Sequence, residues 1–210
     1  MNSSIHQASL SSSEQSLINS LDNRQADMVE TMLAWSSQNS GSRNRAGLDA
    51  MRAILMTYLK RLPGTVVEKP LEPGSFVQPD GQRVDVEYAP SILVTVRPEA
   101  PIQLVLTGHY DTVFPEDSHF QEPIYLNDET INGPGTADMK GGLLVMGEAL
   151  KALEKSEHAQ NIGYNVLISP DEEIGSPGLP GFIEAHKKAL SADVLIASDG
   201  PRLKPDRPTM

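Results

Sequence analysis

Four short segments of the sequence carry residue types that can bind metal ions or transfer protons. The first, GHYDTV, places His109 and Asp111 two positions apart, directly after an apolar run at residues 102–107. Imidazole is a good zinc ligand, and a nearby carboxylate can take the N–H of the other ring nitrogen, which fixes the tautomer and increases the basicity of the metal-facing nitrogen. The same pattern also fits a structural histidine at a strand end, followed by a turn-forming aspartate.

The second segment, NGPGTADMKGG, crowds glycines around Asp138 just before a predicted helix. Such glycine density suits a loop whose backbone approaches something closely or takes up positive φ. Helix capping is the usual explanation for an aspartate in this place. The alternative is a carboxylate with both oxygens free to bridge two cations, for which the glycines leave clearance.

The third and fourth segments, SPDEEIGS and ASDGP, place acids immediately after two further apolar strands. A charge run such as Asp171, Glu172 and Glu173 is usually a solvated face, and Asp199 before a glycine fits a simple turn. Adjacent carboxylates at the end of a buried strand repel one another, however. That repulsion is relieved if a divalent cation binds one of them and a proton shuttles on another.

The elements that must position these residues alternate between strands and helices, which predicts a layered α/β sheet. We expect helices within residues 17–33, 48–59, 139–153 and 179–190, and strands at 65–68, 84–88, 92–96, 102–107, 164–169 and 194–197. In such sheets ligands bind beyond the carboxyl ends of strands, where all four segments fall. The sequence therefore predicts one cluster of N and O ligands, suited to zinc, cobalt or manganese.

Together these segments resemble the metal-site motifs of the zinc-dependent family of acetylornithine deacetylase, succinyl-diaminopimelate desuccinylase and glutamate carboxypeptidase. The resemblance covers residues 92–201. It implies an incomplete three-layer α/β/α fold of the zinc exopeptidase type, with a mostly parallel mixed sheet. It also implies two zinc ions per complete site, and hydrolysis of an amide bond next to a free carboxylate in an N-acyl amino acid or a short peptide.

Carried over by motif, the resemblance assigns each site residue a role. His109 and Asp199 would bind one zinc, Asp138 would bridge two, and Glu173 would bind the other. Asp111 would orient His109, and Glu172 would be the general base that takes a proton from water and returns it to the leaving amine. The peptide bond between Asp138 and Met139 is expected to be cis.

The family's catalytic domain is interrupted by a lid or dimerisation domain and later supplies a second zinc-binding histidine, which has no counterpart here. We therefore expect a mobile tail at residues 1–12, the amino-terminal part of the catalytic domain at 13–204, and the start of the connection to the missing domain at 205–210. Such a fragment would hold at most one tightly bound metal and be weakly active or inactive. The parent protein could be a homodimer.

The composition limits the kinds of partner and metal ligand that the chain can use. The 210 residues carry a net charge of −11, which repels nucleic acid and anionic lipid. The chain has no cysteine, so a metal must use His, Asp and Glu. No apolar run approaches the ~20 residues that cross a bilayer, and the amino terminus does not have the pattern of a secretion signal, so we expect a cytoplasmic protein without a membrane partner.

Two other functions fit the same residues. The chain could be a non-catalytic metal-binding or interaction module derived from this fold. It could also belong to an aminopeptidase that shares the metal site but requires a free amino terminus on its substrate. Substrate identity is open, because the groups that grip the substrate carboxylate are usually on the inserted domain of the family.

Overall fold

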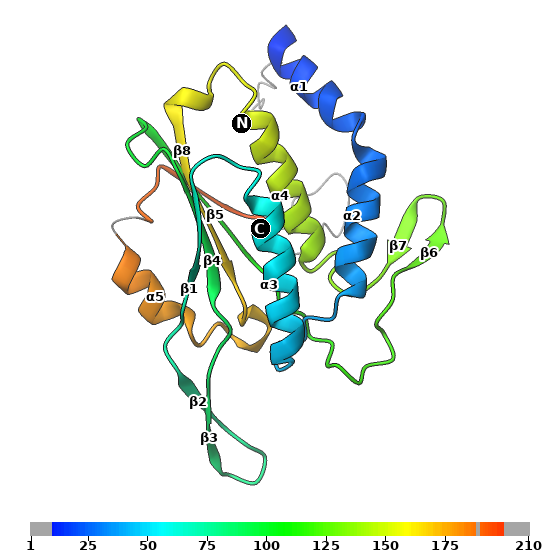
Figure 1. Ribbon diagram of the computed structural model, residues 1–210, viewed down its shortest axis with the longest axis vertical. Helices are drawn as coiled ribbons and strands as arrows, with labels where there is room; N and C mark the ends of the chain where they lie inside the picture. Colours follow the sequence, from blue (N-terminus) through cyan, green and yellow to red (C-terminus); the bar gives the residue numbers. More distant parts are fainter. Residues whose placement is uncertain (1–9, 188–189, 200–210) are drawn as a thin grey trace, which may run out of the picture.

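Five strands form the central sheet of the computed structural model, which describes residues 10–187 and 190–199 (Figure 1). β4 is antiparallel to both β1 and β8, whereas β5 is parallel to both β8 and β9, so only β4 runs against the other strands. The sheet is thus mixed and mostly parallel, as predicted. Its order is β1 (Thr65–Lys69), β4 (Ser91–Val96), β8 (Ile162–Ser169), β5 (Ile102–His109) and β9 (Val194–Ala197).

Helices cover both faces of this sheet, which confirms the predicted three-layer α/β/α architecture (Figure 1). The larger layer contains α1 (Ser12–Asp22), α2 (Gln25–Ser37), α3 (Arg45–Leu59) and α4 (Lys140–Leu153). The opposite face packs against α5 (Leu179–His186). The helical apolar pattern of residues 139–153 is borne out, because Leu143, Met146 and Leu150 are buried on one side of α4.

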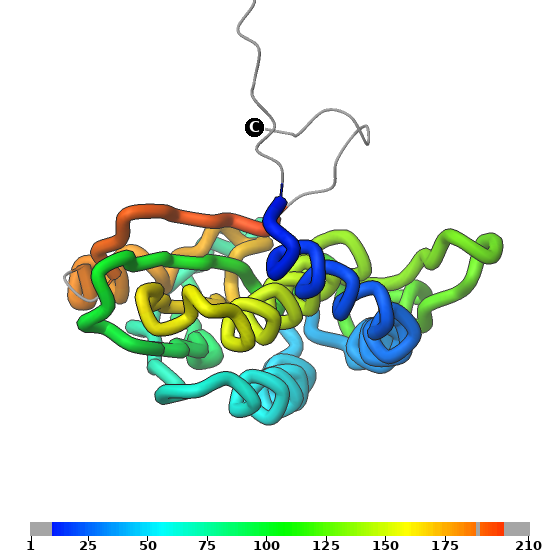
Figure 2. Tube along the Cα trace, turned by 90° about the horizontal axis from the view of Figure 1, so that it is seen from above, coloured from blue at the N-terminus to red at the C-terminus, as the bar shows by residue number. Residues whose placement is uncertain are grey.

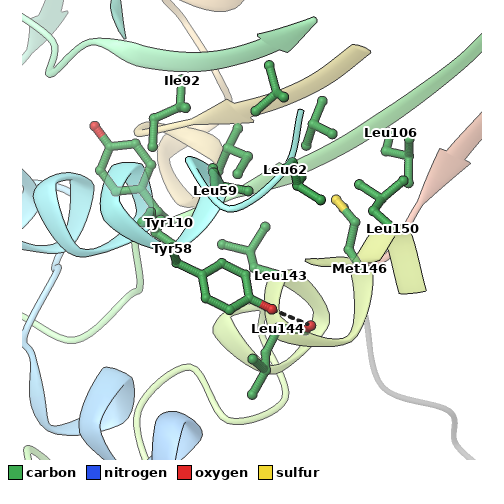
Figure 3. Close-up of a cluster of buried hydrophobic side chains, with 14 of the residues drawn as sticks. Tyr58, Leu59, Leu62, Ile92, Leu106, Tyr110, Leu143, Leu144, Met146 and Leu150 are labelled. Carbon is green, nitrogen blue, oxygen red and sulfur yellow. Dashed lines mark hydrogen bonds between the residues drawn. The ribbon is translucent and has the colours of Figure 1, made fainter. Parts of the chain in front are cut away.

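Alternation along β4 divides the core between the two faces. Ile92 and Val94 belong to the main cluster, which Figure 3 shows between the sheet and helices α3 and α4, whereas Leu93 packs on the other side with Leu167 and Phe182. Successive side chains of a strand point to opposite faces, so one apolar strand can hold both layers. The sheet is thereby fixed from both sides near β4 and β8.

Two exposed hairpins were not fully predicted. β2 (Gly74–Val77) pairs with β3 (Arg83–Val86), and β6 (Ile124–Asn127) pairs with β7 (Thr130–Asn132). Only β3 was expected. Pro73-Gly74 is typical of a turn, which hid the start of β2, and β6 and β7 are short and largely exposed. At the amino end, Ser11 caps α1, so helix begins inside the expected tail; residues 1–9 and 205–210 lie outside the described residues.

β9 is an apolar strand at the outer edge of the sheet, where Figure 2 shows it in orange-red beyond β5. All four of its residues are exposed, and Leu195 is 66% exposed. In β5 only Val105, Leu106 and His109 are buried, and the apolar residue Ile102 at its start is 45% exposed. No helix among the described residues has the length and hydropathy that crossing a membrane requires.

This exposed edge predicts self-association, because the outer edge of β9 has no partner strand among the described residues and such an apolar edge is a template for another chain. Replacing Leu195 with Lys should shift the chain toward monomer in sedimentation velocity. Val77→Lys, at a similarly exposed apolar residue of the β2–β3 hairpin, is the matched control and should leave the distribution unchanged. Equal behaviour of wild type and Leu195→Lys at high concentration would contradict the prediction.

Candidate metal centre

His109 is the last residue of β5 and is almost fully buried, with 1% of its surface exposed. It pairs in register with Ser169, the last residue of the parallel strand β8, and Thr107 pairs with Ala197 at the end of β9. The carboxyl ends of three parallel strands therefore meet at one edge. This register brings together the segments that follow each strand, as their positions in the sequence predicted.

Asp111 is completely buried beneath this edge and connects three segments of the chain. Its Oδ1 lies 3.2 Å from His109 Nδ1, and Ser42 Oγ donates to its Oδ2 at 2.7 Å. The backbone N–H groups of Glu172 and Glu173 also donate to this carboxylate, each at 3.2 Å. Asp111 is thus placed to orient the imidazole and, at the same time, to fix the loop that carries both glutamates.

The other ring nitrogen of His109 faces two further carboxylates. Its Nε2 lies 3.1 Å from Asp138 Oδ1 and 3.7 Å from Asp199 Oδ1. One potential ligand atom from each of the three residues lies within 4.8 Å of the others. Among the described residues this is the only group of three such side chains close enough to hold a metal ion.

Asp138 does not cap helix α4, which was the alternative explanation for its position. The N-cap residue is Met139, without a side-chain cap hydrogen bond. The Asp138 carboxylate is half exposed and points to His109, from a peptide bond with Met139 that is cis, as expected. Its oxygens are therefore available to a cation.

The two predicted glutamates are neighbours in the chain but differ in how close their carboxylates lie to the three potential ligands. Both lie in the short helix η2 (Glu172–Ile174), after which Gly175 turns the chain with a φ of 88°. Glu172 Oε2 is 3.8 Å from His109 Nε2, so its carboxylate borders the cluster. Glu173 is not within the group of three, although the negative charge of Asp138 helps to raise its pKa, after the larger effect of burial.

Electrostatics favour a cation at this place. Burial alone would lower the pKa of His109, but its hydrogen bond to Asp111 and the charges of Asp111, Asp199 and Glu172 outweigh this and raise the pKa to about 9. Burial and the negative charge of Asp199 raise the pKa of Asp138. Since an imidazole nitrogen and two carboxylates are a donor set that zinc accepts, the arrangement fits a divalent metal.

Other acids and histidines serve different purposes. Asp171, which the sequence grouped with the two glutamates, is buried and accepts a hydrogen bond from Gly178 N at 2.8 Å, so it closes the turn before α5. His119 and His158 are exposed and His186 stacks on Phe182, and none of them joins the metal group; His6 lies outside the described residues.

Two supporting residues were missed from the sequence. Ser42 reads as part of a turn cluster, and nothing local signals its contact with Asp111. Lys140 is fully buried, and its Nζ donates to Trp35 O at 3.0 Å and to Gln38 O at 2.6 Å, which ties the start of α4 to the end of α2. Burial lowers the pKa of Lys140 to about 8. Its place within the MKGG segment was the only available signal.

Comparison with known proteins identifies a family and several relatives. The family model described as peptidase family M20/M25/M40 matches residues 105–209, which is half of the chain. The chain is 33% identical over 135 residues to acetylornithine deacetylase of Edwardsiella ictaluri, covering 60% of this chain and 34% of that protein. It is 25% identical over 203 residues to human Beta-Ala-His dipeptidase, covering 90% and 39%.

Solved structures show the same fold. Human carnosine dipeptidase 1 matches with a TM-score of 0.74 and 22% identity, covering 90% of this chain and 41% of that one. An M20 family metallo-carboxypeptidase from Sulfolobus solfataricus matches with a TM-score of 0.65 and 23% identity, covering 85% and 38%. The chain therefore belongs to peptidase family M20/M25/M40. It spans between about a third and two fifths of the length of these relatives.

The raised pKa of His109 gives a pH-dependent prediction for the metal-free protein. A folded-state value of about 9 lies above the ~6.5 of an unfolded histidine, so the stabilisation is fully present below ~6.5 and is lost as the pH rises through about 9. Asp111→Asn should move the titration of His109, followed by NMR, down toward ~6.5. Ser42→Ala keeps the Asp111 charge and should shift the pKa of His109 less. An unchanged titration of His109 in Asp111→Asn would show that Asp111 does not cause the raised pKa.

Proposed function

We propose that this chain is the metal-binding part of a hydrolase that cleaves amide bonds next to a free carboxylate, in N-acyl amino acids or short peptides. The observation that carries the proposal is the meeting of His109, Asp138 and Asp199 within 4.8 Å at the carboxyl edge of a mostly parallel sheet. Family membership supports the same chemistry, since relatives are named as deacetylases, dipeptidases and a carboxypeptidase.

Zinc is the metal that the donor set fits best, and cobalt or manganese would also suit it. His109 and Asp199 would hold one ion, Asp138 would bridge to a second, and Glu173 would bind that second ion. The first position has three donors among the described residues and the second has two, so this chain by itself should retain at most one ion tightly. When bound, the metal would polarise the amide carbonyl and lower the pKa of water.

Glu172 would act as the general base. Its backbone is held by Asp111, while its side chain is 45% exposed beside the imidazole, so its carboxylate can reach both a water molecule and the substrate. It would accept a proton from the attacking water and donate that proton to the nitrogen of the leaving amine. Asp111 would keep the His109 ring oriented during the whole reaction, because among the described residues the Asp111 carboxylate contacts only groups that do not react.

The substrates are proposed for the polypeptide that contains this segment. A small N-acyl amino acid fits the naming of acetylornithine deacetylase, and a short peptide fits that of Beta-Ala-His dipeptidase. We further propose that residues 13–204 belong to the catalytic domain and that the parent protein is a homodimer. A cytoplasmic location also stays a prediction.

Zinc analysis and turnover should separate the roles of the acids. Glu172→Gln should keep the zinc content of wild type, since it would remove a base and not a ligand, whereas Asp138→Asn should lose most of it. Zinc is measured by elemental analysis after dialysis, with about one ion expected per wild-type chain. Two tightly held ions per chain would contradict the assignment of ligands.

Activity is then measured on a complete polypeptide carrying the same segment, with acylated amino acids and dipeptides as substrates. Glu172→Gln should reduce kcat by at least ~100-fold, the usual contribution of a general base. Asp128→Asn, which changes an exposed acid in the turn between β6 and β7, is the control. A Glu172→Gln enzyme with the wild-type rate would refute the role of the base, and no turnover of any substrate by the wild type would favour a non-catalytic module.

A further inference from the structure

A cleft of about 640 Å³ opens beside the candidate metal centre. Its walls come from the loop that joins α2 to α3, from the segment after β5, and from η2, including Glu173. Arg43 is the one cationic side chain among its lining residues within the described part of the chain. A substrate held at the metal centre would extend into such a space, so Arg43 is placed to contact the part of the substrate away from the scissile amide.

The backbone of Arg43 is fixed on both sides. Ser42 N donates to Thr112 O at 3.1 Å and its side chain donates to Asp111, so the preceding residue is tied to the metal centre. Asn44 accepts a hydrogen bond from Gly47 N at 3.0 Å and thereby caps helix α3. The backbone at Arg43 is therefore held in place, which lowers the conformational entropy that would be lost when Arg43 binds a ligand.

The side chain is also partly ordered. Its guanidinium lies over the ring of Phe76, 4.7 Å from the centroid, in strand β2 of the exposed hairpin. Stacking uses the face of the guanidinium and leaves its N–H edge available. Within residues 10–187 and 190–199, no carboxylate forms an ion pair with Arg43 and no hydrogen bond uses its guanidinium, in contrast to Arg45, which binds Asp49.

The remaining charges of the cleft are negative. Glu116, Asp117 and Glu173 line it together with Arg43. Glu173 is proposed to face a metal ion, which would neutralise its charge, and Glu116 and Asp117 are exposed, where water and salt screen them. Arg43 is exposed as well, but its guanidinium is oriented by the ring of Phe76 and forms no ion pair among the described residues, so it remains available to an anion in the cleft. A planar carboxylate matches the paired N–H groups of a guanidinium.

We propose that Arg43 binds a carboxylate of the substrate in this cleft and makes the enzyme selective for substrates with an acidic side chain. This inference rests on the proposed function, because it assigns the substrate class of the same site. The carboxylate in question lies on the side chain, apart from the one next to the scissile amide.

The test compares two nearly isosteric probes, N-acetyl-L-glutamate and N-acetyl-L-glutamine, which differ by one side-chain charge. Binding to the zinc-loaded chain is measured by calorimetry. Wild type should bind the glutamate compound about five- to tenfold more tightly, a range typical of a partly exposed charged contact. Arg43→Gln should abolish this preference while leaving the affinity for N-acetyl-L-glutamine unchanged.

Two further variants separate binding from structure. Arg45→Gln removes a neighbouring exposed cation that is already paired, and it should keep the preference. Phe76→Leu should reduce the preference without removing any charge, because the guanidinium loses its stacking partner. A preference that persists in Arg43→Gln, or that is lost equally in Arg45→Gln, would overturn the proposal.

The zinc content of the same samples distinguishes the two levels of inference. If wild type binds zinc and shows no preference for the glutamate probe, the role of Arg43 is wrong and the proposed metal centre stands. If wild type does not bind zinc, the proposed function itself fails, whatever the two probes do.

Discussion

The buried carboxylate of Asp111 is the interaction on which the candidate site depends. It contacts His109 Nδ1 and accepts hydrogen bonds from the Ser42 hydroxyl and from the backbone N–H groups of Glu172 and Glu173. A buried charge is costly unless hydrogen bonds compensate it, and here the compensating donors are the segments that must be held together. The same set of contacts therefore orients the imidazole, fixes the loop with the two glutamates and compensates the buried charge of Asp111.

The parallel strands make this arrangement reachable. β5, β8 and β9 end at the same edge, so residues separated by up to ninety positions, from His109 to Asp199, come within 3.7 Å of each other without any long side chain. The resulting concentration of carboxylates is unfavourable without a counter-charge. Burial in the first place, and neighbouring carboxylates after it, raise the pKa values of Asp138 and Glu173. A divalent cation would relieve this repulsion, which connects the fold directly to the proposed chemistry.

Much of this was predictable from the sequence, for identifiable reasons. Apolar runs located the strands of the sheet, and the polar residues at their ends pointed to His109 and Asp199, because position at a strand end is a local property. Asp138 was indicated instead by the glycine-rich segment before helix α4. Ser42 and Lys140 were not found, since each acts through a contact far away in the chain. Strands β2, β6 and β7 were missed because each has only three or four residues and lies in an exposed hairpin, and the sequence could not reveal that Asp171 is structural.

The most direct test of the account is zinc K-edge X-ray absorption spectroscopy of the zinc-loaded chain, compared with His109→Ala. The account predicts one imidazole nitrogen together with carboxylate oxygens at about 2.0–2.2 Å, and loss of the imidazole signal in the variant. A spectrum with several imidazoles, or one that His109→Ala leaves unchanged, would show that zinc binds elsewhere and would contradict the central claim.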